Sequence, residues 1–260
     1  GDQAPDPVVV DLPIAYISRP LPVDEDGNRV SSDIFDPTAF NAGASLLLKD
    51  RATPAAAVTD ITTAAFGEES FYDVKNLETS ADGNRLLFAM RAPEIDDADE
   101  DEQPRWNIWE FVRDTQVLRR IISSDNRAES GQDIDPHYLP DGRIVFSSDR
   151  QRRSQSILLD DNKPQYSGLT ENRDTEAFNL HVMDADGNNI EQLTFNQSHD
   201  LQPTVLADGR ILFNRWDNQS FRNNLSLYTI NPDGSGLAQH YGYHSQNTGT
   251  DDSNAMFYEP

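Results

Sequence analysis

Cysteine is absent from this chain of 260 residues. Its absence excludes disulfide bonds, thiol catalysis, zinc–thiolate sites and haem attachment through a Cys-x-x-Cys-His motif within these residues. Long apolar runs are missing as well, since no window approaches the roughly 20 residues that cross a membrane as a helix. Nucleophile-elbow, phosphate-loop and dinucleotide-binding fingerprints do not occur. The chain therefore lacks the sequence signatures of several common catalytic centres.

Basic residues are scarce. Lys and Arg number 21 against 45 Asp and Glu, a formal net charge of −24, and the lysines are Lys49, Lys75 and Lys163. Such a surface repels phosphate backbones, so we expect no nucleic-acid partner. A solvated surface adapted to a saline setting explains the charge, and an acidic interaction site is the alternative. The densest part, Asp96–Glu102, is predicted to be a mobile loop between two strands, with a weak divalent-cation site as the alternative.

A phrase built around an Asp-Gly pair occurs three times. Tyr138–Arg150 reads YLPDGRIVFSSDR, Asn76–Arg91 reads NLETSADGNRLLFAMR, and Pro203–Trp216 reads PTVLADGRILFNRW. In each copy an extended segment leads through Asp-Gly, a pair that suits turns with two positive-φ residues, into a short apolar run. Each copy predicts a β-hairpin.

A second hairpin follows each copy. Asn179–Thr194 and Asn224–Gln239 share a short strand, an Asp-Gly turn and a second strand, and Trp106–Ile121 is a degenerate form. Two hairpins per unit make a four-stranded sheet, the blade of a β-propeller. The predicted fold class is all-β, a propeller of four-stranded antiparallel blades.

The predicted organisation has three parts. Residues 1–12 are polar and Pro-rich and predict an N-terminal tether from which any signal peptide has been removed. Residues 13–240 hold blades one to four, and residues 241–260 begin a fifth blade or form a closing segment. We expect four blades within a larger ring of six to eight. Closure with four blades, or completion by other chains, is the alternative.

The individual blades differ in regularity. Blade one is divergent, with strands at Ile14–Ser18 and Ser45–Asp50 and an excursion over Leu21–Gly43. The other blades span Val74–Ile122, Ile134–Thr194 and Leu201–Gln239, and Gln151–Phe178 is predicted to be a long loop within the third.

These units resemble the WD40-like repeats of TolB-type propellers, and more closely the propeller region of hydrazine synthase alpha-subunit-like proteins. The phrases that carry the resemblance are FYDVKN, LLFAMR, WNIWE, DIDPHYLPDGRIVFSSDR, FNLHVMDADG, FNQSHD and DGRILFNRWD. The resemblance implies c-type haems bound through Cys-x-x-Cys-His motifs, of which this chain has none, so no haem role passes to any residue here. It also implies a periplasmic or cell-surface location, with lipid anchoring at the N-terminus as one form of it.

Polar phrases precede the first strand of blades three and four, and this strand lies nearest the axis of a propeller. They supply the candidate ligand-binding residues at the mouth of the central channel, where propeller pockets lie: Asp135, His137, His199, Asp200 and, in a later echo of the phrase, His244. The alternative is that the carboxylates accept backbone N–H groups and tie adjacent blades together. The three histidines could also bind a transition metal, against ordinary loop hydrogen bonding.

Three further features have two explanations each. Asp184–Asn188 resembles the start of a calcium loop, but a hairpin turn explains it equally. The aromatic residues Trp106, Trp109, Phe111 and Trp216 fit blade packing, or a stacking platform for sugars. Arginines gather around the blade-three insertion and could receive an anionic ligand or pair with neighbouring Asp residues: Arg150, Arg152, Arg153 and Arg173.

The predicted function is a non-catalytic extracytoplasmic propeller that binds a partner protein or further domains of the same polypeptide, within a larger assembly. We expect no cofactor in this chain, with calcium or a transition metal as the alternative. The alternative function is a module of a haem-dependent redox enzyme whose haem sites lie outside this segment. A surface glycan binder is the third hypothesis.

Overall fold

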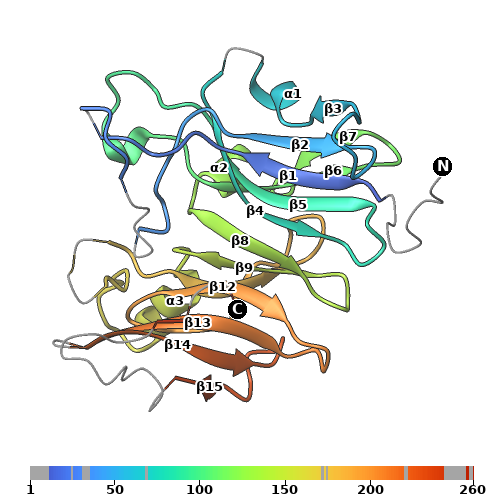
Figure 1. Cartoon of the computed structure of the whole chain (residues 1–260). Coiled ribbons are helices and arrows are strands. Elements are labelled where there is room, and N and C mark those ends of the chain that lie inside the picture. The colour runs from blue at the N-terminus through green and yellow to red at the C-terminus, as the bar shows by residue number, and fades with distance from the viewer. Residues whose placement is uncertain are drawn as a thin grey trace, which may run out of the picture. The chain divides into compact units, whose positions relative to one another are not determined.

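The computed structural model is mainly β (Figure 1), and it describes residues 12–24, 26–30, 36–67, 70–170, 173, 175–219, 222–242, 256–257 and 260. Four antiparallel sheets follow one another along the chain. The first is three-stranded: β1 (Ile14–Ser18), β2 (Ser45–Lys49) and β3 (Val58–Asp60). The second holds β4 (Asp73–Thr79), β5 (Arg85–Arg91), β6 (Asn107–Val112) and β7 (Val117–Arg120).

The third sheet holds β8 (Asp133–Tyr138), β9 (Ile144–Ser148), β10 (Asn179–Met183) and β11 (Glu191–Gln192). The fourth holds β12 (Asp200–Val205), β13 (Ile211–Gln219), β14 (Arg222–Ile230) and β15 (Ala238–Tyr241). In every sheet each strand pairs with the next in sequence, so each four-stranded sheet is two consecutive hairpins. The predicted fold class is confirmed.

The described helices are short: α1 (Thr63–Phe66), α2 (Asp125–Ala128), a 3₁₀ turn at Glu100–Glu102, and α3 (Arg152–Asp160). Helix α3 corrects the prediction of a continuous loop over Gln151–Phe178. None of its residues is buried. None of the helices in the described part of the chain is long and apolar enough to cross a membrane.

The Asp-Gly turns correct a second expectation. Glycine alone takes the positive φ, as at Gly142 (φ 90°) and Gly209 (φ 86°), and the preceding Asp does not. The Leu139 and Arg143 backbones pair across a three-residue loop, the type I turn followed by one left-handed residue. Asp141 adds a bond in which its Oδ1 accepts the Arg143 N–H at 3.0 Å. The turn was expected to have positive φ at both Asp and Gly. Instead, the Asp side chain stabilises it by accepting a hydrogen bond from the residue after the glycine.

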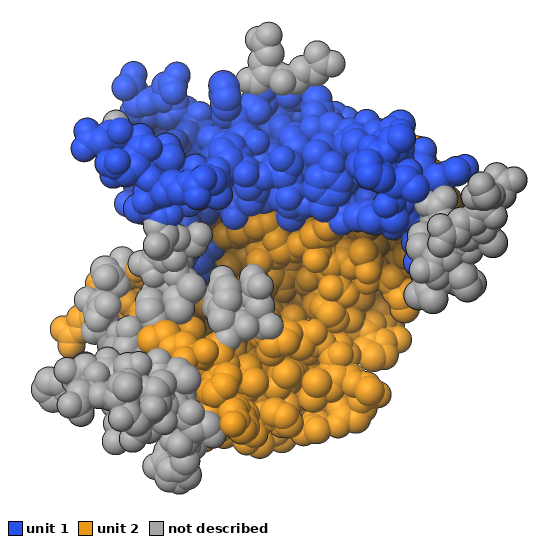
Figure 2. All heavy atoms as spheres, viewed as in Figure 1, with its two compact units in different colours: residues 1–74, 91–103 blue, residues 75–90, 104–260 orange. Residues whose placement is uncertain are grey.

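Two compact units divide the chain (Figure 2): Gly1–Val74 with Arg91–Gln103, and Lys75–Met90 with Pro104–Pro260. Within the larger unit, one buried cluster joins side chains of the second and third sheets, including Leu87, Ile108 and Phe146. A second cluster joins the third and fourth sheets, including Val182 and Phe213. Apolar residues on facing sheets therefore build a separate core at each interface.

The smaller unit repeats a detail of the larger one. The Leu180 N–H donates to Thr194 Oγ1 at 2.9 Å, and the Leu193 N–H donates to the Leu180 carbonyl. In the first sheet, the Leu46 N–H donates to Thr62 Oγ1 at 3.1 Å, and the Ile61 N–H donates to the Leu46 carbonyl. The first sheet is thus a divergent copy of the same repeat.

Candidate functional site

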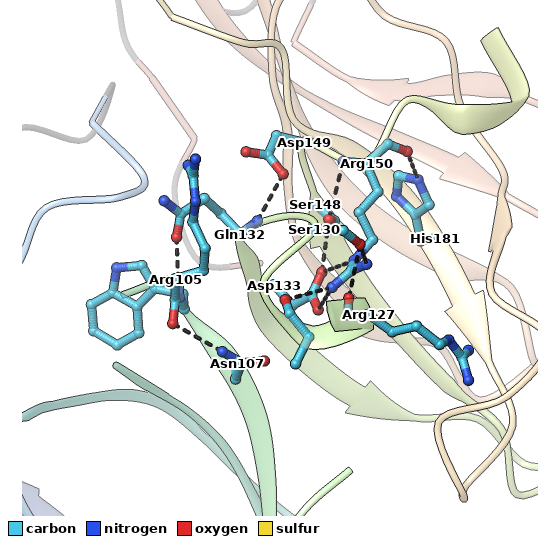
Figure 3. Close-up of polar contacts among 12 residues, drawn as sticks. Arg105, Asn107, Arg127, Ser130, Gln132, Asp133, Ser148, Asp149, Arg150 and His181 are labelled. Atoms are coloured by element: carbon cyan, nitrogen blue, oxygen red, sulfur yellow. Dashed lines mark hydrogen bonds and ion pairs between the residues drawn. The ribbon is translucent and has the colours of Figure 1, made fainter. Parts of the chain in front are cut away.

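Buried ion pairs fix the start of β8 and β12. The Asp133 carboxylate receives Arg150 Nε at 2.7 Å and Nη2 at 2.8 Å, and also Ser148 Oγ at 2.8 Å (Figure 3). Asp200 receives Arg215 Nε and Nη2, both at 2.8 Å. Bidentate pairs of this kind combine charge with fixed geometry. They hold the first strand of each sheet in place.

Each of β4, β8 and β12 contains one residue whose backbone has the left-handed conformation, with positive φ. These residues are Asn76 (φ 56°), Asp135 (φ 51°) and Gln202 (φ 53°). Register shifts after Ile134 in β8 and after Leu201 in β12 mark β-bulges at these points. Positive φ is uncommon for residues other than glycine and concentrates at sites where the backbone is used to aim side chains.

The three segments that contain these left-handed residues line one groove of about 370 Å³. Each strand supplies three consecutive residues, Asn76–Glu78, Asp135–His137 and Gln202–Thr204, and Pro260 completes the lining. Because these are the first strands of three successive sheets, we call this hollow the axial groove. Its walls carry amide, carboxylate, imidazole and hydroxyl groups, which suit recognition of a polar ligand or a peptide chain.

Two contacts join different walls of the axial groove, and a third holds the Gln202 side chain within the fourth sheet. Asp135 Oδ2 accepts the Gln202 N–H at 3.0 Å, so the third sheet is tied to the fourth. The Gln202 side chain accepts Asn214 Nδ2 at 2.7 Å. His137 Nδ1 lies 3.3 Å from Glu78 Oε2, between the second and third sheets. The blade-tying role proposed for Asp135 is therefore observed, beside its place in the groove wall.

The structure separates the five candidate ligand residues. Asp135 and His137 line the axial groove. His199 and Asp200 do not line it: the His199 Nδ1 accepts the Phe178 N–H at 3.1 Å, its ring packs on Trp216 with centroids 5.1 Å apart, and Asp200 is fully buried against Arg215. Both lie in the packing of the fourth sheet. His244 lies outside the described residues. Ligand contact by any of the five stays a prediction.

Sequence reasoning missed other residues of the groove wall, namely Asn76, Glu78, Gln202 and Thr204. A signal for them exists, because Asn76, Asp135 and Gln202 each stand six residues ahead of the Asp of an Asp-Gly pair. Aligning the repeats on that pair would have placed all three together.

Metal and sugar sites receive no added support. Within the part of the chain that the structure describes, no three His, Asp or Glu side chains stand together as a metal-binding group. The carboxylates of the calcium-like turn bond within the turn, where Asp186 Oδ1 accepts the Asn188 N–H at 3.0 Å. Trp106, Phe111 and Trp216 are buried, so they pack inside the sheets as predicted.

No protein-family model matches the chain, and no curated protein matches its sequence. Among solved structures, hydrazine synthase of Kuenenia stuttgartiensis is similar with a TM-score of 0.62 at 18% identity, over 89% of this chain and 32% of that chain. The fold is a β-propeller. A putative TolB of Agrobacterium tumefaciens matches with a TM-score of 0.47 at 15% identity, over 83% of this chain and 69% of that one.

The similarity to the propeller proteins concerns fold alone at these identities. The chain spans about a third of the hydrazine synthase chain that it matches. Its sheets are blades of a propeller, and the axial groove lies along the first strands of three of them.

Proposed function

We propose that this chain is an extracytoplasmic propeller module that binds a partner protein, or another domain of its own polypeptide, through the axial groove, and that it is not catalytic by itself. The observation that carries the proposal is the convergence of three equivalent segments, each with one left-handed residue, on one polar groove. Backbone conformations that cost free energy persist where the surrounding structure enforces them, and such positions concentrate at binding sites.

The absence of native cysteine permits a direct test. Thr204→Cys places a single thiol in the groove wall, and Val117→Cys places one on the exposed outermost strand of the second blade. Each purified variant is labelled with a photoactivatable maleimide and exposed to the periplasmic or the cytoplasmic fraction of the source cells. We expect one cross-linked product from position 204 with the periplasmic fraction alone, and none from position 117.

A third variant provides the control for groove chemistry. Glu78→Gln keeps the shape of the wall and removes the charge of the Glu78 carboxylate. It should therefore lower the yield of the cross-linked product formed from position 204. Equal products from both positions, or products from position 117 alone, would show that the groove is not the binding surface. A product formed only with the cytoplasmic fraction would overturn the location.

A module of a haem-dependent redox enzyme is the second candidate, and the similarity to hydrazine synthase over 89% of this chain favours it. In that case the haem ligands lie on other residues of the polypeptide or on another chain. The protein from its native source would then have a Soret absorption band and a mass well above 29.2 kDa. A native protein without haem would remove this candidate.

A further inference from the structure

A second hollow, of about 600 Å³, lies in the third blade and its surroundings, and we call it the arginine pocket. Four guanidinium groups line it, from Arg127 in α2, Arg150 after β9, and Arg152 and Arg153 in the first turn of α3. Its size is that of a small-molecule site. Four arginines around one hollow stand out in a chain with a net charge of −24.

One of these arginines is neutralised within the fold. Arg150 is 4% exposed and donates to both oxygens of Asp133 and to the Ala128 carbonyl (Figure 3). His181 also lines the pocket, and its Nε2 lies 2.5 Å from the Arg150 carbonyl oxygen. Arg150 is therefore a fixed part of the wall.

The other three guanidinium groups bind neutral acceptors. Arg127 donates to the Gly187 carbonyl at 2.8 Å and to Asn188 Oδ1 at 2.9 Å. Arg152 donates to Ser130 Oγ at 3.0 Å, and Arg153 reaches the Gln192 carbonyl at 3.4 Å. Among the described residues none of the three forms an ion pair, whereas Arg143 and Arg210, which are half-buried, each lie against an Asp. Two carboxylates, Glu191 and Asp233, line the same hollow, but within the described residues neither forms an ion pair with these arginines.

Two features make the uncompensated charge unfavourable. Arg150 and Arg152 donate to the same oxygen, Ser130 Oγ, at 2.7 and 3.0 Å, which holds the unpaired guanidinium of Arg152 beside that of Arg150. Arg152 and Arg153 also open α3, which has no acidic residue in its first turn and no side-chain bond from its N-cap residue. Cations at the N-terminus of a helix oppose the helix dipole. An anion in the pocket would offset both effects.

We propose that the arginine pocket binds an organic oxyanion, a carboxylate or a phosphate monoester, through Arg127, Arg152 and Arg153. Guanidinium groups bind both classes by paired N–H donors. Glu191 and Asp233 also line the pocket and oppose the anion. They limit the negative charge that the pocket accepts.

Calorimetric titration with two probes, citrate and inorganic phosphate, tests the proposal against sodium chloride at equal ionic strength. The native chain should bind at least one probe, and the double variant Arg152→Gln/Arg153→Gln should lose about tenfold or more in affinity. Arg210→Gln removes an arginine elsewhere and should leave binding unchanged. Binding of citrate alone assigns carboxylates, and binding of phosphate alone assigns phosphate monoesters.

A misfolded variant can lose affinity but does not gain it, so a variant that is expected to bind more tightly provides a control. Glu191→Gln removes one carboxylate from the wall, so it should tighten the binding of whichever probe the native chain takes. Absence of binding by both probes overturns the proposal. It is also overturned if chloride gives the same heat, or if the double variant binds like the native chain.

Discussion

The carboxylates that matter most to this fold are buried beside arginine. Asp133 and Asp200 each begin the first strand of a blade and are fully buried, and each binds one guanidinium through both oxygens. Asp73 begins β4 and binds Arg19 in the same way. Removal of one member of such a pair leaves an uncompensated buried charge. These aspartates therefore have a structural role in the fold, and burial alone does not identify a carboxylate as catalytic.

Asp149 differs, because no arginine among the described residues binds it through both oxygens. Its Oδ1 accepts the Gln132 N–H at 2.7 Å (Figure 3), and desolvation raises the pKa of Asp149 to about 7. An aspartate in the unfolded chain loses its proton near pH 4. Between these two values the folded chain holds a proton that the unfolded chain has released. The contribution of Asp149 to stability therefore falls as the pH rises from about 4 to about 7.

Asp149→Asn should remove this loss, since an amide keeps the acceptor for Gln132 and does not ionise. Its free energy of unfolding should exceed that of the native chain by a margin that grows by about 1 to 2 kcal/mol between pH 5 and pH 8, because partial solvent contact reduces the full effect. Urea denaturation at both pH values measures the margin. Asp96→Asn removes the same charge from an exposed site. A margin of equal size at both pH values would contradict the assignment.

At the scale of elements, hairpins were predictable and their distortions were not. The Asp-Gly phrases locate the paired strands because a turn signal and an alternating apolar run occupy the same short window. The distortion at Gln202 is indicated only by its spacing from the Asp-Gly pair, and its backbone N–H donates to Asp135 of the preceding blade. Helix α3 likewise owes its position to a tertiary contact, in which Gln192 Oε1 accepts the Ser154 N–H at 3.3 Å.

The candidate site divides in the same manner. Asp135 and His137 were accessible to sequence reasoning because their polar phrase directly precedes an Asp-Gly hairpin. His199 does not line the groove, because its ring packs between Phe178 and Trp216, and ligand contact by it stays a prediction. The sequence pattern predicts in which strand or loop each of these residues lies. The direction of each side chain depends on tertiary packing, which the pattern does not contain.

The turn at Gly187 packs more tightly against its neighbours than the other described Asp-Gly turns do. A Cβ at Gly187 would lie 2.5 Å from the Ile121 carbonyl oxygen, whereas a Cβ at Gly209 would meet no atom within 4 Å. Both glycines have positive φ, 79° and 86°. Both substitutions to alanine therefore carry a similar conformational cost of about 1 kcal/mol.

Gly187→Ala should destabilise the chain by at least about 2 kcal/mol more than Gly209→Ala, since backbone of the second blade must shift to admit the methyl group. Urea unfolding of the two variants and the native chain gives the comparison directly. Similar losses in both variants would mean that this turn does not pack against Ile121.

At the scale of the whole molecule, cores between neighbouring blades and a strongly acidic surface act in opposite directions. Leu87 and Phe146 share one inter-blade core, and Val182 and Phe213 share another, so burial couples the second blade to the third and the third to the fourth. The net charge of −24 opposes the compact state through self-repulsion. The buried Asp133–Arg150 pair is shielded from salt, while the surface repulsion is exposed to it.

Sodium chloride should therefore stabilise this protein near pH 7. The Debye length falls from about 30 Å at 0.01 M salt to about 3 Å at 1 M, which removes most of the repulsion between surface carboxylates. We expect the thermal midpoint to rise by several degrees, at about 2 to 4 °C for each kcal/mol gained. Near the isoelectric point of 4.3 the net charge vanishes, so the same salt series should leave the midpoint almost unchanged. An equal rise of the thermal midpoint at both pH values would mean that salt acts through hydration of the protein. Repulsion between surface charges would then not destabilise the fold.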